Sequence, residues 1–155
     1  YNKENTQRFI DGILKEKGDT MFHGFLLLDM DHFKEINDNY GHIVGDKVLK
    51  ALGKLLQEHF REEDVVGRIG GDEFVVLLYN IGSRENMEAR VQSLQKKIRE
   101  MEIKELGEKR LSISAGIAFA PKDGCSFMDL YRKADNALYQ TKRAGRDGYH
   151  VYEKQ

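Results

Sequence analysis

Apolar residues recur along the chain with two different periods, and the period changes from one segment to the next. A spacing of three to four positions is typical of amphipathic helices, and it occurs in segments 5–17, 44–60, 84–103 and 126–143. Segment 110–120 alternates at every second position, as a half-buried strand does. Segment 22–30 contains the unbroken run Phe25-Leu26-Leu27-Leu28, which suits a strand buried on both faces.

The middle of the chain predicts a β-hairpin, because two apolar runs flank the pair Gly70-Gly71. Asp31 has the residue type of an N-cap and precedes a short helix expected at 32–39. A final strand is expected at 149–152. The predicted order is αβααββαβαβ, which excludes a purely parallel doubly wound sheet. We therefore predict an α/β (α+β) fold with a central mixed sheet flanked by helices.

Length and charge narrow the class of protein. With 155 residues the chain suits one domain, residues 1–155. A third of the residues are charged but the net charge is −1, which argues against nucleic acid or an anionic membrane as a partner. No apolar stretch is long enough to span a bilayer, no signal peptide is evident, and the lone Cys125 has no disulfide partner. We expect a cytoplasmic domain without membrane contact, cut from a longer signalling protein that can itself be membrane-tethered, because the chain opens at Tyr1.

Two acidic segments stand out against this background. Asp29 and Asp31 end the apolar strand, where a buried carboxylate needs a cation, donors or water. Asp72 and Glu73 follow the two glycines, where adjacent like charges repel unless water or a cation screens them. Each segment alone also fits a simpler interpretation: Asp31 caps the next helix with Asp29 in a solvated loop, and the hairpin has a plain acidic turn.

Together the segments indicate a metal site. If the strand lies beside the hairpin, Asp29 can meet Asp72 or Glu73, and such a set of hard oxygen ligands suits Mg²⁺. Magnesium keeps few protein ligands and prefers to bind phosphate oxygens of a substrate as well, which favours an enzyme that acts on nucleoside triphosphates. The spacing fits neither an EF-hand loop nor a Walker loop, and no His-Glu-x-x-His zinc motif occurs.

The run Gly70-Gly71-Asp72-Glu73-Phe74 resembles the motif that names the GGDEF family. Segments 29–38, 41–49, 114–118, 134–139 and 142–146 also resemble the family in order and spacing, so the resemblance covers nearly the whole chain. It implies a fold similar to the palm of nucleotidyl cyclases and polymerases. It also implies a diguanylate cyclase, which condenses two GTP into cyclic di-GMP and two pyrophosphates across a homodimer, with Mg²⁺, or Mn²⁺ in its place, as cofactor.

The resemblance further implies roles for individual residues. The metal ligands would be Asp29, the Met30 carbonyl, Asp72 and Glu73, and Asp72 or Glu73 would help to deprotonate the 3′-hydroxyl. Gly70 and Gly71 permit positive φ and let backbone donors approach the phosphates. The remaining GTP contacts fall into two groups: Asn37 and Asp46 for the guanine, and Lys34, Lys142 and Arg146 for the triphosphate. The residues alone also fit solvated lysines and a helix-capping asparagine.

Arg61 and Asp64 have the offset of the family's inhibitory Arg-x-x-Asp site for cyclic di-GMP. An exposed charged turn at a helix end is the alternative. Two departures from the family are the missing Asp-x-Leu-Thr-Gly-Leu opening and Asp147 in place of the common Asn. A second function stays open, a non-catalytic receptor for GTP or cyclic di-GMP, although the intact glycine and acidic positions favour the enzyme.

Overall fold

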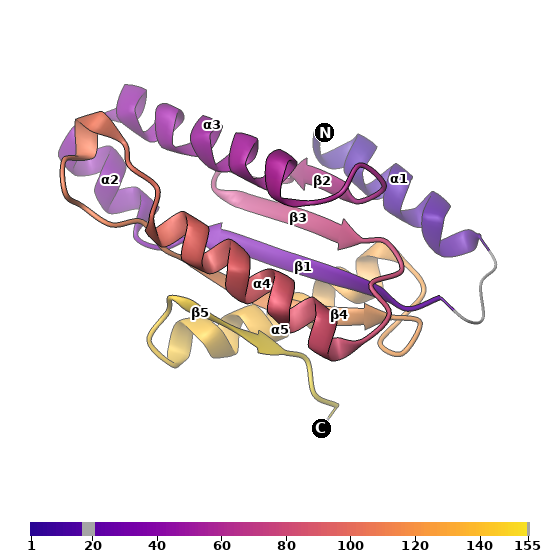
Figure 1. The fold of residues 1–155 in the computed structure, drawn as a ribbon. Coiled ribbons are helices and arrows are strands. Elements are labelled where there is room, and N and C mark those ends of the chain that lie inside the picture. The colour runs from indigo at the N-terminus through magenta and orange to yellow at the C-terminus, as the bar shows by residue number, and fades with distance from the viewer. Residues whose placement is uncertain (17–20, 155) are drawn as a thin grey trace.

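The computed structural model of the chain describes residues 1–16 and 21–154 (Figure 1). In this part of the chain five strands form one sheet in the order β2-β3-β1-β4-β5. All neighbouring strands are antiparallel except β4 and β5, which are parallel. The predicted mixed sheet is therefore confirmed. Its strands are β1 (His23–Met30), β2 (Val65–Arg68), β3 (Glu73–Leu78), β4 (Ile113–Ala120) and β5 (Gly148–Val151).

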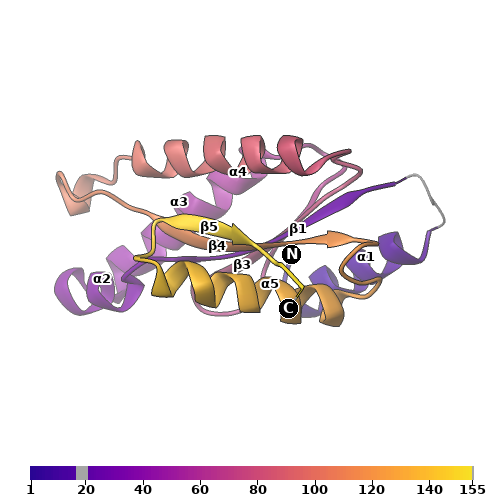
Figure 2. The ribbon, with the colours of Figure 1, turned by 90° about the horizontal axis from the view of Figure 1, so that it is seen from below.

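Helices cover both faces of the sheet, with α3 and α4 on one side and α1 and α5 on the other (Figure 2). None of the helices described is long and apolar enough to cross a membrane. The predicted order of elements is confirmed. The helices are α1 (Lys3–Lys15), α2 (Phe33–Tyr40), α3 (His42–His59), α4 (Arg84–Arg99), the short 3₁₀ helix η1 (Lys104–Leu106) and α5 (Phe127–Arg143).

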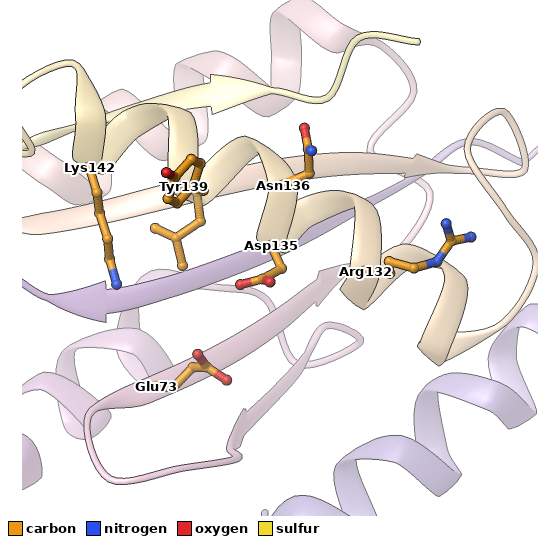
Figure 3. Close-up of a pocket in the computed structure, with 7 residues that line it drawn as sticks. Glu73, Arg132, Asp135, Asn136, Tyr139 and Lys142 are labelled. Carbon is orange, nitrogen blue, oxygen red and sulfur yellow. The ribbon is translucent and has the colours of Figure 1, made fainter. Parts of the chain in front are cut away.

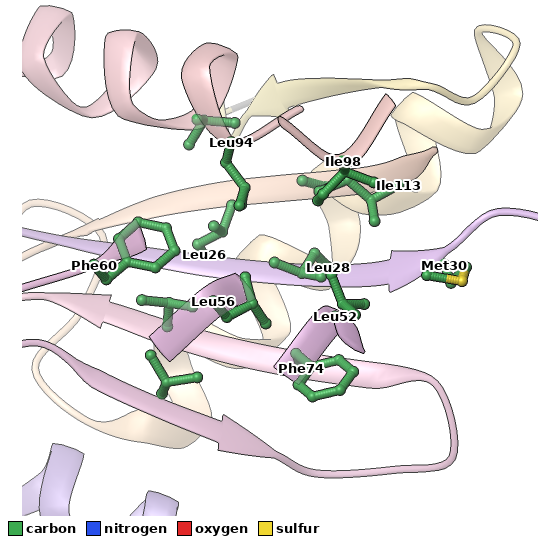
Figure 4. Packing of buried hydrophobic residues seen from close by; sticks show 14 of the residues in the cluster. Leu26, Leu28, Met30, Leu52, Leu56, Phe60, Phe74, Leu94, Ile98 and Ile113 are labelled. Carbon is green, nitrogen blue, oxygen red and sulfur yellow. The ribbon is translucent and has the colours of Figure 1, made fainter. Parts of the chain in front are cut away.

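The central strand β1 explains why the sheet needs two layers of helices. All eight of its residues are buried, as its continuous apolar run predicts. Leu26 and Leu28 pack against α3 and α4 (Figure 4), while Phe25 and Leu27 pack against α1 and α5. The acidic end of β1 is thus the point where a fully buried strand reaches the edge of the core.

Several element ends differ from those that the periodicity predicts. The helix predicted to reach 103 ends at Arg99, and the strand predicted to begin at 110 begins at Ile113, because η1 and a turn at Gly107 (φ 62°) occupy the interval. At the N-terminus, Asn2 caps α1 by accepting from the Asn5 N–H, so this helix begins before the predicted residue 5. Its predicted end at 17 lies outside the described residues.

The prediction that Asp31 caps the next helix is wrong. The N-cap of α2 is His32, in the left-handed region (φ 58°), and no side chain caps this helix. The Asp31 carboxylate instead accepts hydrogen bonds from the hydroxyls of Ser112 (2.6 Å) and Ser114 (2.5 Å) and from the Asp147 N–H (3.0 Å). Asp31 thereby ties the end of β1 to β4 and to the loop between α5 and β5.

Candidate functional site

The structure brings the two acidic segments together. Asp29 on β1 and Glu73 on β3 are cross-strand partners, and residues opposite each other in a sheet share a face. Asp72 immediately precedes β3, and its charge contributes to the raised pKa of Asp29. The three carboxylates thus lie at the same end of the sheet, and the hard-oxygen site stays a prediction.

Asp29 is nearly buried, with 7% of its surface exposed. The Lys142 ammonium lies 2.6 Å from Oδ2, whereas Oδ1 is buried and has no hydrogen-bond partner in the described part of the chain. Burial raises the pKa of Asp29, Lys142 opposes this rise, and the charges of Asp72 and Asp31 add to it. One lysine therefore compensates this carboxylate only in part, and an acceptor remains for a further cation or donor.

Glu73 is held from helix α5 by a residue that the sequence analysis missed. The Tyr131 hydroxyl donates to Glu73 Oε1 at 2.6 Å. Burial first, and then the Glu73 carboxylate, raise the pKa of Tyr131, so the phenol remains protonated as a donor. Helical spacing could have indicated this contact, because Tyr131 and Lys142 lie about three turns apart on one helix.

A hollow of about 360 Å³ lies beside these groups (Figure 3). Glu73 and Lys142 border it, and Asp135 on α5 lies near Glu73. Its lining is mostly the surface of α5, comprising Arg132, Asp135, Asn136, Leu138, Tyr139 and Lys142.

The two residues predicted to read guanine lie on a helical pair. Asn37 is within α2, so the alternative of a helix-capping asparagine is wrong, and Asp46 is exposed on α3. Gly41 (φ 90°) links the two helices. A Cβ at Gly45 would lie 1.9 Å from Asn37 Oδ1, so only glycine at this position lets the carboxamide rest against α3. No local pattern in the sequence marks this role of Gly45.

The predicted triphosphate contacts come from different elements. Lys142 lies in the last turn of α5, and Arg146 follows the turn that ends this helix at Gly145 (φ 115°). The Gly145 and Arg146 N–H groups donate to the carbonyls of Lys142 and Thr141, a Schellman arrangement. Lys34 is exposed on the first turn of α2, and no contact in the described structure links it to the other two.

Gly70 and Gly71 lie between β2 and β3, and neither has a positive φ. Their carbonyls accept from the Arg68 side chain at 3.2 and 2.9 Å. A Cβ at Gly71 would meet nothing within 4 Å. The turn therefore does not need glycine for its backbone angles, and close approach of a ligand stays a prediction.

Arg61 and Asp64 lie together between α3 and β2. The Asp64 side chain is only 1% exposed and accepts from the backbone N–H groups of Arg61 (2.9 Å) and Tyr79 (2.8 Å). The Arg61 guanidinium donates to the Tyr79 carbonyl at 2.6 Å and is 42% exposed. Asp64 therefore holds the turn itself, and Arg61 is the member of the pair that reaches the surface.

The residues fit a magnesium ion that is shared with a substrate better than a preformed metal cage. Among the described residues, no group of three or more histidine, cysteine or acidic side chains is arranged to hold an ion. Magnesium commonly takes one or two carboxylates and completes its shell with phosphates and water. The unpartnered, buried Oδ1 of Asp29, beside Asp72, is a suitable ligand for such an ion.

Comparison with known proteins identifies the family and the fold of the chain. The family described as "Diguanylate cyclase, GGDEF domain" matches residues 1–148. The chain belongs to the GGDEF family. The crystal structure of the GGDEF domain of YfiN from Pseudomonas aeruginosa superposes with a TM-score of 0.93 at 29% identity, covering 100% of this chain and 98% of that one. The α/β fold is thus that of a GGDEF domain.

Relatives of this GGDEF domain differ in their named activities. Diguanylate cyclase DgcP of Pseudomonas aeruginosa is 42% identical over 81% of this chain and 18% of its own length. Cyclic di-GMP phosphodiesterase PdeR of Escherichia coli is 34% identical over 97% of this chain and 22% of its own length. The chain therefore spans less than a quarter of either relative, each of which carries the homologous region within a much longer protein.

Proposed function

We propose that this GGDEF domain is a diguanylate cyclase, which joins two GTP molecules into cyclic di-GMP and releases two pyrophosphates. The observation that carries the proposal is the pairing of Asp29 with Glu73 across β1 and β3, beside Asp72 and under Lys142. A receptor for cyclic di-GMP alone would have no need to keep a buried carboxylate with an unpartnered oxygen at this place, and a receptor for GTP is separated from the enzyme by the test of turnover below.

The chain's own side chains would bind and orient GTP. Asn37 and Asp46 offer an amide and a carboxylate that can satisfy the acceptor and donor edges of guanine. The cationic residues Lys34, Lys142 and Arg146 would neutralise the triphosphate. The backbone N–H groups of Gly70 and Gly71 would approach the phosphates from the hairpin.

A magnesium ion, or manganese in its place, would be held by Asp29, the Met30 carbonyl, Asp72 and Glu73. When bound, such an ion polarises the phosphate and lowers the pKa of an attacking hydroxyl. Asp72 or Glu73 would accept the proton of the 3′-hydroxyl. On binding of GTP, Lys142 would exchange its contact with Asp29 for the phosphates, which present more negative charge.

Each chain would supply half of an active site. Two domains would meet face to face as a homodimer, and each 3′-hydroxyl would attack the α-phosphate of the opposite GTP in line. Positioning of the two nucleotides and neutralisation of their charge would provide most of the rate.

Chromatography of nucleotides after incubation with GTP and Mg²⁺ tests the proposal, with the protein concentration varied and Asp72→Ala as control. We expect cyclic di-GMP from the wild type only, at a rate that rises faster than linearly with protein concentration. If enforced dimers bind GTP but form no product, the domain is a receptor instead. Activity retained by Asp72→Ala would remove this residue from the site.

We further propose that cyclic di-GMP inhibits the enzyme at Arg61 and Asp64. Arg61 is the exposed partner, and a guanidinium can both stack on guanine and donate in a fork to phosphate. Calorimetry with cyclic di-GMP should give weaker binding for Arg61→Ala than for the wild type. Equal dissociation constants would refute this site.

A further inference from the structure

Helix α5 fixes the orientation of Glu73 through Tyr131. The hydroxyl of Tyr131 lies 2.6 Å from Glu73 Oε1. The tyrosine ring is itself held, because it stacks on Phe127 with ring centroids 5.9 Å apart and packs against the apolar cluster between the sheet and α1 and α5. A rigid ring therefore aims the donor at one oxygen of the carboxylate.

This arrangement engages one of the two oxygens of Glu73. Oε1 accepts from α5, while Glu73 stands opposite Asp29 in the sheet register. Carboxylates that bind metal ions are commonly hydrogen-bonded on their other oxygen, and this second contact orients the ligand. Without it, the side chain of Glu73 would rotate among its rotamers and present either oxygen, or neither, to the site.

We propose that Tyr131 is a positioning residue that orients Glu73 as a ligand of the divalent cation. This inference rests on the proposed function, since it takes the cation site at Asp29, Asp72 and Glu73 as given. Tyr131 itself touches neither the cation nor the nucleotide. Loss of such an orienting partner typically weakens metal affinity about 10- to 100-fold.

The test compares Tyr131→Phe with Tyr152→Phe. Both variants lose one hydroxyl from side chains that pack against the same apolar cluster, and Tyr152 has no hydrogen bond to Glu73 in the described structure. The affinity for Mn²⁺ is measured by electron paramagnetic resonance in the presence of 3′-deoxy-GTP, which lacks the attacking hydroxyl and so cannot cyclise. Circular dichroism verifies that both variants are folded, as expected when the aromatic ring is kept.

We expect Tyr131→Phe to bind Mn²⁺ about 10- to 100-fold more weakly than the wild type, and Tyr152→Phe to bind it within about twofold. The same change made in a Glu73→Gln background should have no further effect on Mn²⁺ affinity, since the partner that Tyr131 orients is already altered. Unchanged affinity in Tyr131→Phe, or an equal loss with Gln at position 73, would overturn the inference.

This binding experiment is independent of turnover. If the wild type forms no cyclic di-GMP but binds Mn²⁺ in a manner that depends on Tyr131, the cyclase proposal fails and the positioning role stands. If the wild type is an active cyclase and Tyr131→Phe retains both its Mn²⁺ affinity and its requirement for Mg²⁺ in turnover, the positioning role fails alone.

Discussion

Substitution of Gly45 by alanine tests the proposed recognition of guanine separately from the stability of the fold. The added Cβ would lie 1.9 Å from Oδ1 of Asn37, 3.0 Å from its Cγ and 3.3 Å from the ring of Phe33. Carbon contacts normally lie at about 3.5 Å, so the carboxamide must retreat by about 1.5 Å. The atom in the way is the end of a side chain that can rotate, and the helix backbones need not part.

The effects on stability and on binding should therefore differ in size. Overpacking costs about 1–3 kcal/mol, and alanine in place of glycine within a helix returns about 1 kcal/mol, so the free energy of unfolding should fall by about 2 kcal/mol or less. Loss of the proposed contact between the Asn37 amide and guanine would leave polar groups unpaired, which costs about 1–3 kcal/mol. This corresponds to a rise of about 5- to 150-fold in the Kd for GTP.

The assay is calorimetric binding of 3′-deoxy-GTP with Mg²⁺, beside urea unfolding of the same samples. Gly53→Ala is the matched control on the same helix, because its Cβ would meet no atom closer than 3.8 Å, from the Phe74 ring. It should keep the wild-type affinity and gain stability, by up to about 1 kcal/mol. If Gly45→Ala binds 3′-deoxy-GTP as tightly as Gly53→Ala does, the Asn37 carboxamide does not contact the guanine.

Three further predictions concern the carboxylates and the packing of α5. Because the pKa of Asp29 is raised, the folded state keeps this proton to a higher pH than the unfolded state, and the free energy of unfolding should fall as the pH rises from the ordinary aspartate pKa through the raised one. Asp29→Asn should remove this loss and unfold at a higher urea concentration at neutral pH. Parallel pH profiles of the two proteins would contradict the prediction. Gly116→Ala would place a Cβ 2.0 Å from the Ala134 carbonyl oxygen, which is a backbone atom, so α5 must move away from the sheet. Thermal unfolding should show that the free energy of unfolding falls by about 3 kcal/mol, and a fall below about 1 kcal/mol would mean that the helix shifts freely. Asp64→Asn should lower the free energy of unfolding in urea by about 1–3 kcal/mol. The carboxylate accepts from the backbone N–H groups of Arg61 and Tyr79 with its two oxygens, whereas an amide would turn its N–H₂ group towards one of these donors. Unchanged stability would show that these hydrogen bonds are dispensable.

Much of the fold could be predicted because its signals are local in sequence. The unbroken apolar run of β1 requires cover on both faces, and the apolar pairs around Gly70-Gly71 require a hairpin. The interval 100–112 could not be predicted, because a 3₁₀ turn has a period close to that of a helix and its end depends on the single left-handed Gly107.

The candidate site was predicted only as far as a motif specifies it. Residues such as Asp29 and Asp72 lie in short segments with a characteristic spacing, and the sheet register then brings those segments together. Gly45 acts through a contact with the adjacent helix that no local pattern marks. Tyr131 contacts a side chain distant in sequence, and only its helical spacing from Lys142 could have indicated this contact. Asp64 was predicted with its motif, but its burial and its two backbone donors depend on the tertiary turn.

The two aspartates at the end of β1 are both nearly buried but differ in how the fold satisfies their carboxylates. Both are nearly buried, at 7% exposure for Asp29 and 6% for Asp31. Asp31 accepts from two serine hydroxyls and a backbone N–H, so protein donors fixed by the fold satisfy both of its oxygens. Asp29 has one flexible lysine on one oxygen and nothing on the other in the described structure, and burial raises its pKa despite that lysine. Because an unsatisfied buried charge costs stability, a protein gains by retaining it only where a ligand completes the set, and Asp29 rather than Asp31 therefore fits the proposed cation site.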